Sequence, residues 1–157
     1  MAIAQGMTEL ATVTLSANST SIIFSNIPNT FRDLVVQGQA AAGQNTYIIL
    51  NGDGADANYS SKTMYGEAST ISSTFNNDAR VISLDQSPNT AFKIEIFSYA
   101  KTDRHTQIIS QSGAIGIVRT FGVRWKNTAA VNSVRLNPQS GYPFLAGSTF
   151  SIYGVGV

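Results

Sequence analysis

The clearest strand pattern in the chain is the stretch Ala91-Phe92-Lys93-Ile94-Glu95-Ile96-Phe97-Ser98-Tyr99. Apolar and polar residues alternate along it, as they do in a β-strand with one face on a protein core. The alternation predicts one face with Phe92, Ile94, Ile96 and Ser98 and another with Lys93, Glu95, Phe97 and Tyr99. We therefore expect this segment to be a central strand of a β-sheet.

Weaker stretches of the same kind recur along the chain and are separated by Gly, Pro, Asn and Asp. The segments that we expect to be strands are 10–15, 21–24, 31–36, 46–50, 81–84, 106–111, 115–125, 130–136 and 150–157. Residues 58–77 are rich in Ser and Thr and predict short edge strands and loops. About 8–10 short strands without a helical period indicate an all-β protein, a jelly-roll-like antiparallel β-sandwich. Two four-stranded sheets, face to face, fit this count best.

The composition agrees with an all-β fold. The 157 residues are 43% hydrophobic and 12% charged, with a net charge of +1 and no Cys. Ser, Thr and Asn supply the polarity, and these side chains compete for backbone hydrogen bonds, which disfavours helices. The high apolar share disfavours disorder, and no apolar run is long enough for a membrane-spanning helix. Because no linker or change of composition interrupts the chain, we expect one domain over residues 1–157, with no membrane partner.

Catalytic residues are hard to assemble from this sequence. His105 is the only histidine and lies in the polar segment 101–105, which predicts a solvated loop. Glycoside hydrolysis needs two facing carboxylates, and Glu67, Glu95 and Asp103 form no obvious pair. We therefore expect no enzymatic activity, no catalytic residue and no cofactor.

Metal and nucleic-acid sites find little support. The segment 51–58 is rich in oxygen ligands, but a calcium loop counted from Asn51 has Ala55 at position five and Lys62 at position twelve. Its Gly and Asn residues suit a turn, so we expect no metal. A basic group that could bind single-stranded nucleic acid consists of Arg119, Arg124, Trp125 and Lys126. The near-neutral charge and the strand pattern, which places Trp125 in the core, argue against a nucleic-acid partner.

Carbohydrate binding is a stronger alternative, because sugars stack on exposed aromatic rings. The available tyrosines are Tyr47, Tyr59, Tyr65, Tyr99, Tyr142 and Tyr153. Most of them lie in strand patterns, which predicts partial burial.

Three blocks of the sequence resemble a known family. The first is IFSNIPNTFRDLVV at 23–36, followed by Leu50-Asn51-Gly52-Asp53 and Asn58-Tyr59-Ser60; the second is RWKNTAAVNSVRL at 124–136; the third is GSTFSIYGV at 147–155. Together they resemble the small β-sandwich virion proteins of tailed bacteriophages, which occur as head decoration (cement) proteins or as tail-fibre modules. These blocks are turn and strand signatures, and the resemblance implies no catalytic residue.

The resemblance implies a non-enzymatic capsid decoration protein that binds and stabilises the lattice of the major capsid protein. It also implies a homotrimer on the capsid surface of a virion assembled in the host cytoplasm, which suits the absence of Cys. Since the chain begins with Met and ends in a strand pattern, we expect a whole protein, which favours decoration. The alternative is a tail-fibre or receptor-binding module that recognises host carbohydrate through aromatics in the segments 58–75 and 139–144.

The N-terminal segment is the predicted capsid contact. Residues 1–10 precede the first firm strand pattern and carry the apolar side chains Ile3, Met7 and Leu10. We expect them to form an extended arm, and we expect deletion of residues 1–8 to abolish capsid binding without disturbing the fold.

Overall fold

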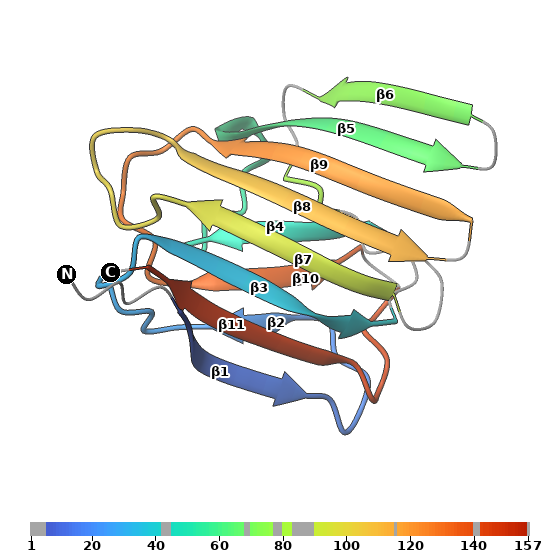
Figure 1. The fold of residues 1–157 in the computed structure, drawn as a ribbon, viewed down its shortest axis with the longest axis horizontal. Helices are drawn as coiled ribbons and strands as arrows, with labels where there is room; N and C mark the ends of the chain where they lie inside the picture. The colour runs from blue at the N-terminus through green and yellow to red at the C-terminus, as the bar shows by residue number, and fades with distance from the viewer. Residues whose placement is uncertain are drawn as a thin grey trace.

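The computed structural model describes residues 6–41, 45–67, 70–76, 80–82, 90–114, 116–139 and 142–156. Their regular structure is eleven β-strands and one short 3-10 turn, η1 (Asp56–Asn58). All of these strands pair in antiparallel fashion (Figure 1). The predicted all-β fold is confirmed.

Eight strands form one large sheet, in the order β1-β11-β3-β7-β8-β9-β5-β6. In that order their bounds are Met7–Thr14, Thr149–Val155, Asp33–Ala40, Thr90–Phe97, Thr106–Ala114, Ile117–Trp125, Tyr59–Glu67 and Thr70–Asn76. Strands β1 and β6 are therefore the two ends of the sheet (Figure 1).

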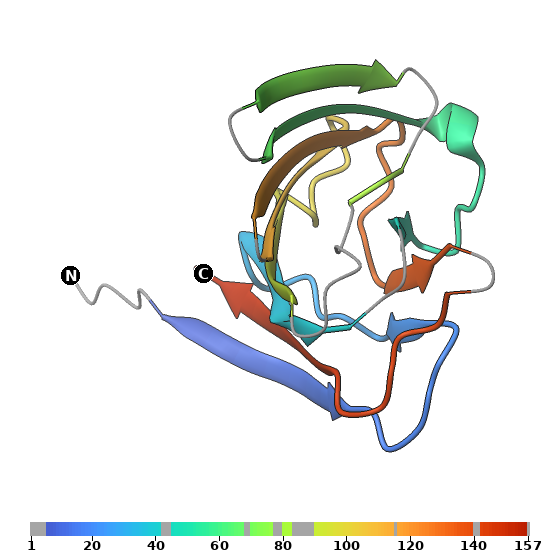
Figure 2. The same ribbon diagram turned by 90° about the vertical axis from the view of Figure 1, so that its right-hand side faces the viewer.

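The other three strands form a small sheet in the order β2-β10-β4, with bounds Ile22–Phe24, Val134–Pro138 and Thr46–Leu50. The large sheet curls around the small one (Figure 2). One hydrophobic cluster fills the space between them and includes Ile94 of β7, Leu136 of β10 and Ile48 of β4. The β-sandwich is thus confirmed, but its strands divide into eight and three instead of four and four.

The segment 91–99, whose alternation predicts the fold, forms most of strand β7 and the start of the turn that follows it. Phe92, Ile94 and Ile96 are buried, as the alternation predicts. The strand ends at Phe97, and Ser98 has a φ of +52° in the left-handed region. This turn breaks the alternation, so the prediction that Tyr99 faces away from the core is wrong: Tyr99 is fully buried.

Residues 59–67 and 70–76 differ most from expectation. They form two long strands, β5 and β6, and β5 is an internal strand between β9 and β6. This hairpin extends the large sheet beyond the expected size and accounts for the unequal division. Of the expected strand 81–84, Val81 forms an isolated bridge with Tyr47 and Ile82 is buried, while residues 83 and 84 lie outside the described residues.

Candidate functional site

The face of the large sheet that points away from the core, called here the outer face, exposes several large apolar side chains. They are Met64, Ile71, Phe75, Ile109 and Val118, whose exposed fractions are 57%, 90%, 59%, 38% and 63%. We call these five residues the apolar patch. Soluble monomers rarely expose large contiguous apolar areas, and such areas mark contact sites. The apolar patch is therefore the candidate functional site.

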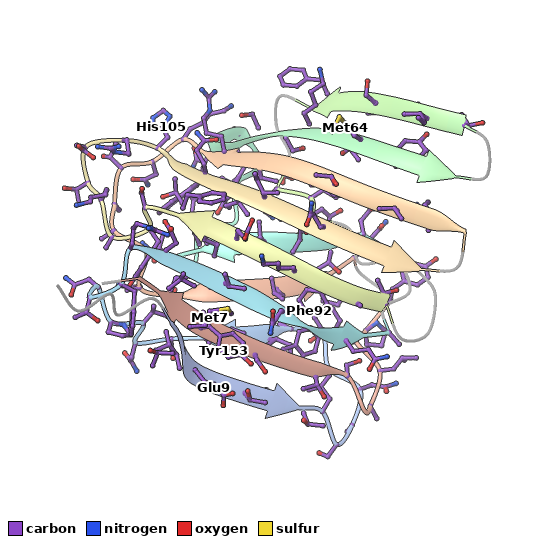
Figure 3. All side chains as sticks on the ribbon, in the orientation of Figure 1. Met7, Glu9, Met64, Phe92, His105 and Tyr153 are labelled. Atoms are coloured by element: carbon purple, nitrogen blue, oxygen red, sulfur yellow. The ribbon has the colours of Figure 1, made fainter. Side chains whose placement is uncertain are left out.

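Strand pairing places the apolar patch on one face. Two rows of opposing residues cross the sheet. One row consists of Ile109, Gly122, Lys62 and Phe75, and the other of Gly113, Val118, Gly66 and Ile71. Residues directly opposite each other in an antiparallel sheet share a face, as do residues two positions apart on a strand. Met64 lies between the two rows on β5 (Figure 3). The five side chains thus share one face of β8, β9, β5 and β6, with Lys62, Thr120 and glycines at positions between them.

Glycines make this area flat. A Cβ built on Gly66, Gly113 or Gly122 would meet nothing within 4 Å, so all three face open space. Beside them, a shallow depression of ≈ 450 Å³ is lined in part by Val118 and Gln111. At these three positions no side chain separates the backbone of the sheet from a partner.

Charge is sparse on the outer face near the apolar patch. Lys93 and Glu95 of β7 form an ion pair of 2.6 Å, and Lys62 of β5 lies in the row of Phe75. Strand β6 contains no charged residue. Covering the β5–β6 end of the apolar patch would thus desolvate one charge, that of Lys62, whereas the exposed Arg124 of β9 lies on the same face beside Ile109.

The predicted N-terminal contact residues separate in the structure. Ile3 lies outside the described residues. Met7 is 47% exposed and lies opposite Val155 (Figure 3). Leu10 occupies a β-bulge between Glu9 and Ala11 and packs partly buried against the core. Met7 and Leu10 therefore do not form a common surface.

Residues 7–10 of the expected arm belong to β1. Met7 pairs with Val155, and Thr8 pairs with Gly154. Deleting residues 1–8 would remove both pairings from an edge strand. The deletion would thus shorten β1 by two residues, and the expectation that it leaves the fold undisturbed stays a prediction.

The oxygen-rich segment 51–58 is a hydrogen-bonded turn. The Asn51 Oδ1 atom accepts hydrogen bonds from the backbone N–H groups of Asn132 (2.8 Å) and Ser133 (3.2 Å). The Asp53 carboxylate accepts one from Trp125 Nε1 (2.8 Å) and others from Asn58 Nδ2 (3.0 Å). These oxygens tie together two of the three sequence blocks, which gives the blocks a structural role.

Asp53 makes this turn sensitive to acid. Burial on its own raises the pKa of the Asp53 carboxyl, but hydrogen bonds from Trp125, Asn58 and Ala55 and the charge of Arg80 outweigh it and hold the pKa below the usual 3.8. The ionised carboxylate therefore stabilises the folded state above pH 3.8, and this stabilisation is lost as the pH falls through the folded-state pKa.

The Asp53→Asn variant tests this turn. At about pH 7 it should lose about 1 kcal/mol of unfolding free energy, because charged hydrogen bonds are replaced by neutral ones. Its unfolding free energy should then fall less than that of the native protein between about pH 5 and about pH 2. Urea unfolding measures both quantities, with Glu9→Gln, a change of an exposed carboxylate on β1, as the control. Equal acid dependence of Asp53→Asn and the native protein would contradict this role.

The remaining candidate chemical groups do not converge. His105 is exposed in the connection between β7 and β8 (Figure 3). Glu95 pairs with Lys93, Asp103 pairs with Arg104 at 2.8 Å, and the Glu67 side chain lies outside the described part. Within the described residues, no group of three His, Cys, Asp or Glu side chains could hold a metal ion, and no helix is long and apolar enough to cross a membrane.

The aromatic residues that could stack on a sugar or a base differ in their exposure to solvent. Trp125 is buried, which confirms its predicted place in the core and removes it from base stacking. Tyr59 and Tyr99 are fully buried, and the Arg80 guanidinium covers Tyr47 at 5.1 Å from the ring centroid. Tyr142 is 41% exposed.

The comparisons with known proteins identify no relative. No family model matches the sequence, and neither a curated protein nor a solved structure matches it. The resemblance to phage virion proteins therefore stays a prediction.

Sequence reasoning missed the apolar patch. On β6 it consists of only two large apolar residues, Ile71 and Phe75, four positions apart in a segment without charges. Ser and Thr fill the positions between them, so the segment has the composition of a loop. A spacing of four positions fits one face of a strand and also one turn of a helix, so the local pattern does not predict this strand.

Proposed function

We propose that the protein is a non-enzymatic structural protein of a phage virion that decorates the capsid and holds neighbouring major capsid subunits together. The apolar patch carries this proposal, because it gathers five exposed apolar side chains on one face of a sheet. Removing apolar surface from water contributes about 25 cal/mol per Å². A partner with an extended protein surface suits such an area better than a small molecule in an enclosed cavity does.

Repetition strengthens weak contacts. On a capsid lattice, many copies bind side by side, and each contact raises the effective concentration for the next contact of the same assembly. The resemblance implies a homotrimer as the assembling unit, and we keep association of identical copies as part of the proposal. The proposed location is the capsid surface, after assembly in the host cytoplasm.

A tail-associated receptor binder is the second candidate. The observation that favours it is the exposure of two aromatic rings, Phe75 at 59% and Tyr142 at 41%, in or beside the segments predicted for carbohydrate contact. Sugars stack on such rings. Because Phe75 also belongs to the apolar patch, a lattice contact and a sugar contact would compete for it.

The number of copies in one virion separates the two candidates. Quantitative gel densitometry of purified particles compares this chain with the major capsid protein. A decoration protein should be present in hundreds of copies, because it repeats with the lattice, whereas a tail module should be present in roughly a dozen. A count at the tail level would overturn the capsid proposal.

A further inference from the structure

Strand β6 is an edge of the large sheet among the residues that the structure describes. It lies at the end of the strand order and pairs with β5 over seven residue pairs without a register shift. Among the described strands, none pairs with its other edge. Its sequence, Thr70-Ile71-Ser72-Ser73-Thr74-Phe75-Asn76, contains no charge, Pro or Gly. Proteins that stay monomeric normally protect such edges with charges, Pro or bulges.

The opposite end of the sheet is built differently. Strand β1 carries a bulge between Glu9 and Ala11, and the charged Glu9 is exposed. A bulge bends and twists an edge away from further pairing. A ring with three-fold symmetry needs two different surfaces in contact, and β1, the other free edge, is poorly suited to pair with β6.

The residue pattern of β6 is symmetric about Ser73. The two large apolar residues, Ile71 and Phe75, lie two positions before and after it, and polar residues fill every other position. If a second copy pairs in antiparallel fashion around a two-fold axis at Ser73, Ile71 of each copy faces Phe75 of the other. Ser72 of each copy then faces Thr74 of the other, on the opposite side of the sheet. Aromatic side chains beside β-branched ones, and Ser beside Thr, are favourable cross-strand pairs.

We propose that two copies of this chain pair through β6 in this register and join their large sheets into one continuous sheet. The two apolar patches become neighbours across the two-fold axis and form one larger apolar face. The pairing does not require the capsid role, although it would double the area that each unit offers to a lattice.

Electrostatics permits this arrangement. Strand β6 brings no charge into the contact, and the nearest cation on the outer face is Lys62, opposite Phe75 on β5. The two copies of Lys62 would lie three strand spacings apart, about 14 Å. They are also displaced along the strands. This separation exceeds the screening length of about 8 Å at physiological salt.

A single cysteine tests the register, because the native chain has none. In Ser73→Cys, the two thiols would face each other with Cα atoms about 4.5–5.5 Å apart, which is within disulfide range. In the matched control Ser72→Cys, the two Cα atoms would be about 7–8 Å apart on a diagonal, beyond that range. Both purified proteins are oxidised with diamide at high concentration and run on a non-reducing gel.

We expect at least about tenfold more cross-linked dimer from Ser73→Cys than from Ser72→Cys. Adding Phe75→Lys to Ser73→Cys should reduce the cross-link by about tenfold, since it removes both cross-strand pairs between Phe75 of one copy and Ile71 of the other. Circular dichroism checks that all three variants keep the β-fold. Equal cross-linking of the two single-cysteine proteins, or stronger cross-linking of Ser72→Cys, would overturn the proposal. These results concern the purified protein alone, so a failure here leaves the copy-number test of the capsid role unaffected.

Discussion

Replacing Gly38 by alanine is expected to cost at least about 3 kcal/mol of unfolding free energy, at the upper end of the range for overpacking. Gly38 lies on β3 opposite Phe150 of β11. A Cβ there would lie 1.9 Å from the Thr149 carbonyl oxygen and 2.9 Å from its carbon. Both are backbone atoms, so relief requires the β3 and β11 strands to separate. Since domains of this size are stable by only about 5–15 kcal/mol, the loss should be obvious in urea unfolding.

Substitutions at two other glycines serve as controls for the Gly38→Ala measurement. A Cβ on Gly154 would come within 2.3 Å of the Phe31 ring, which is a side chain and can move, so Gly154→Ala should cost less than Gly38→Ala. Gly122→Ala on the outer face meets nothing within 4 Å and should stay within about 0.5 kcal/mol of the native protein. If Gly38→Ala unfolds at the same urea concentration as Gly122→Ala, the close approach of β3 and β11 is contradicted.

Replacing Val118 by lysine is expected to weaken binding to capsids by at least about tenfold for each copy. Val118 is 63% exposed in the apolar patch, so the substitution should leave the fold intact. In the proposed complex, the new ammonium group would be buried against the capsid without a partner, and such burial is costly. Because a lattice contact is multivalent, loss at every copy would reduce occupancy steeply.

The matched control for this variant is Gln39→Lys. Gln39 is exposed and lies on β3 in the same row of the outer face, outside the apolar patch. Both proteins carry the same added charge, and each is sedimented with capsids that lack the native chain. We expect binding of Gln39→Lys at the native level and loss of Val118→Lys. Equal binding of the two variants would exclude the apolar patch as the capsid contact.

The sequence predicts those parts of the fold in which one face of a strand is strongly apolar. Phe92, Ile94 and Ile96 alternate with charged residues, and Trp125 ends a second apolar strand, so their burial follows from local pattern alone. The burial of Tyr99 does not follow from this pattern. Ser98 has a left-handed backbone conformation that ends the strand, and the two-residue period no longer applies after it.

The candidate site was harder to predict, because it depends on pairing between distant segments. Ile71, Val118 and Ile109 become neighbours only through the registers of β6 with β5, β5 with β9 and β9 with β8. The strands β5 and β6 also have Ser and Thr on their inner face, so their alternation is weaker than that of β7. Local apolar content directed attention to Ile3, Met7 and Leu10 instead, where a bulge turns Leu10 toward the core.

Imaging of whole virions tests the central claim most directly. Electron microscopy of particles labelled with an antibody to this chain, with particles lacking the chain as the control, shows where the protein lies. The capsid proposal predicts label repeated over the whole surface of the head. Label confined to the tail or its tip, with none on the head, would contradict it.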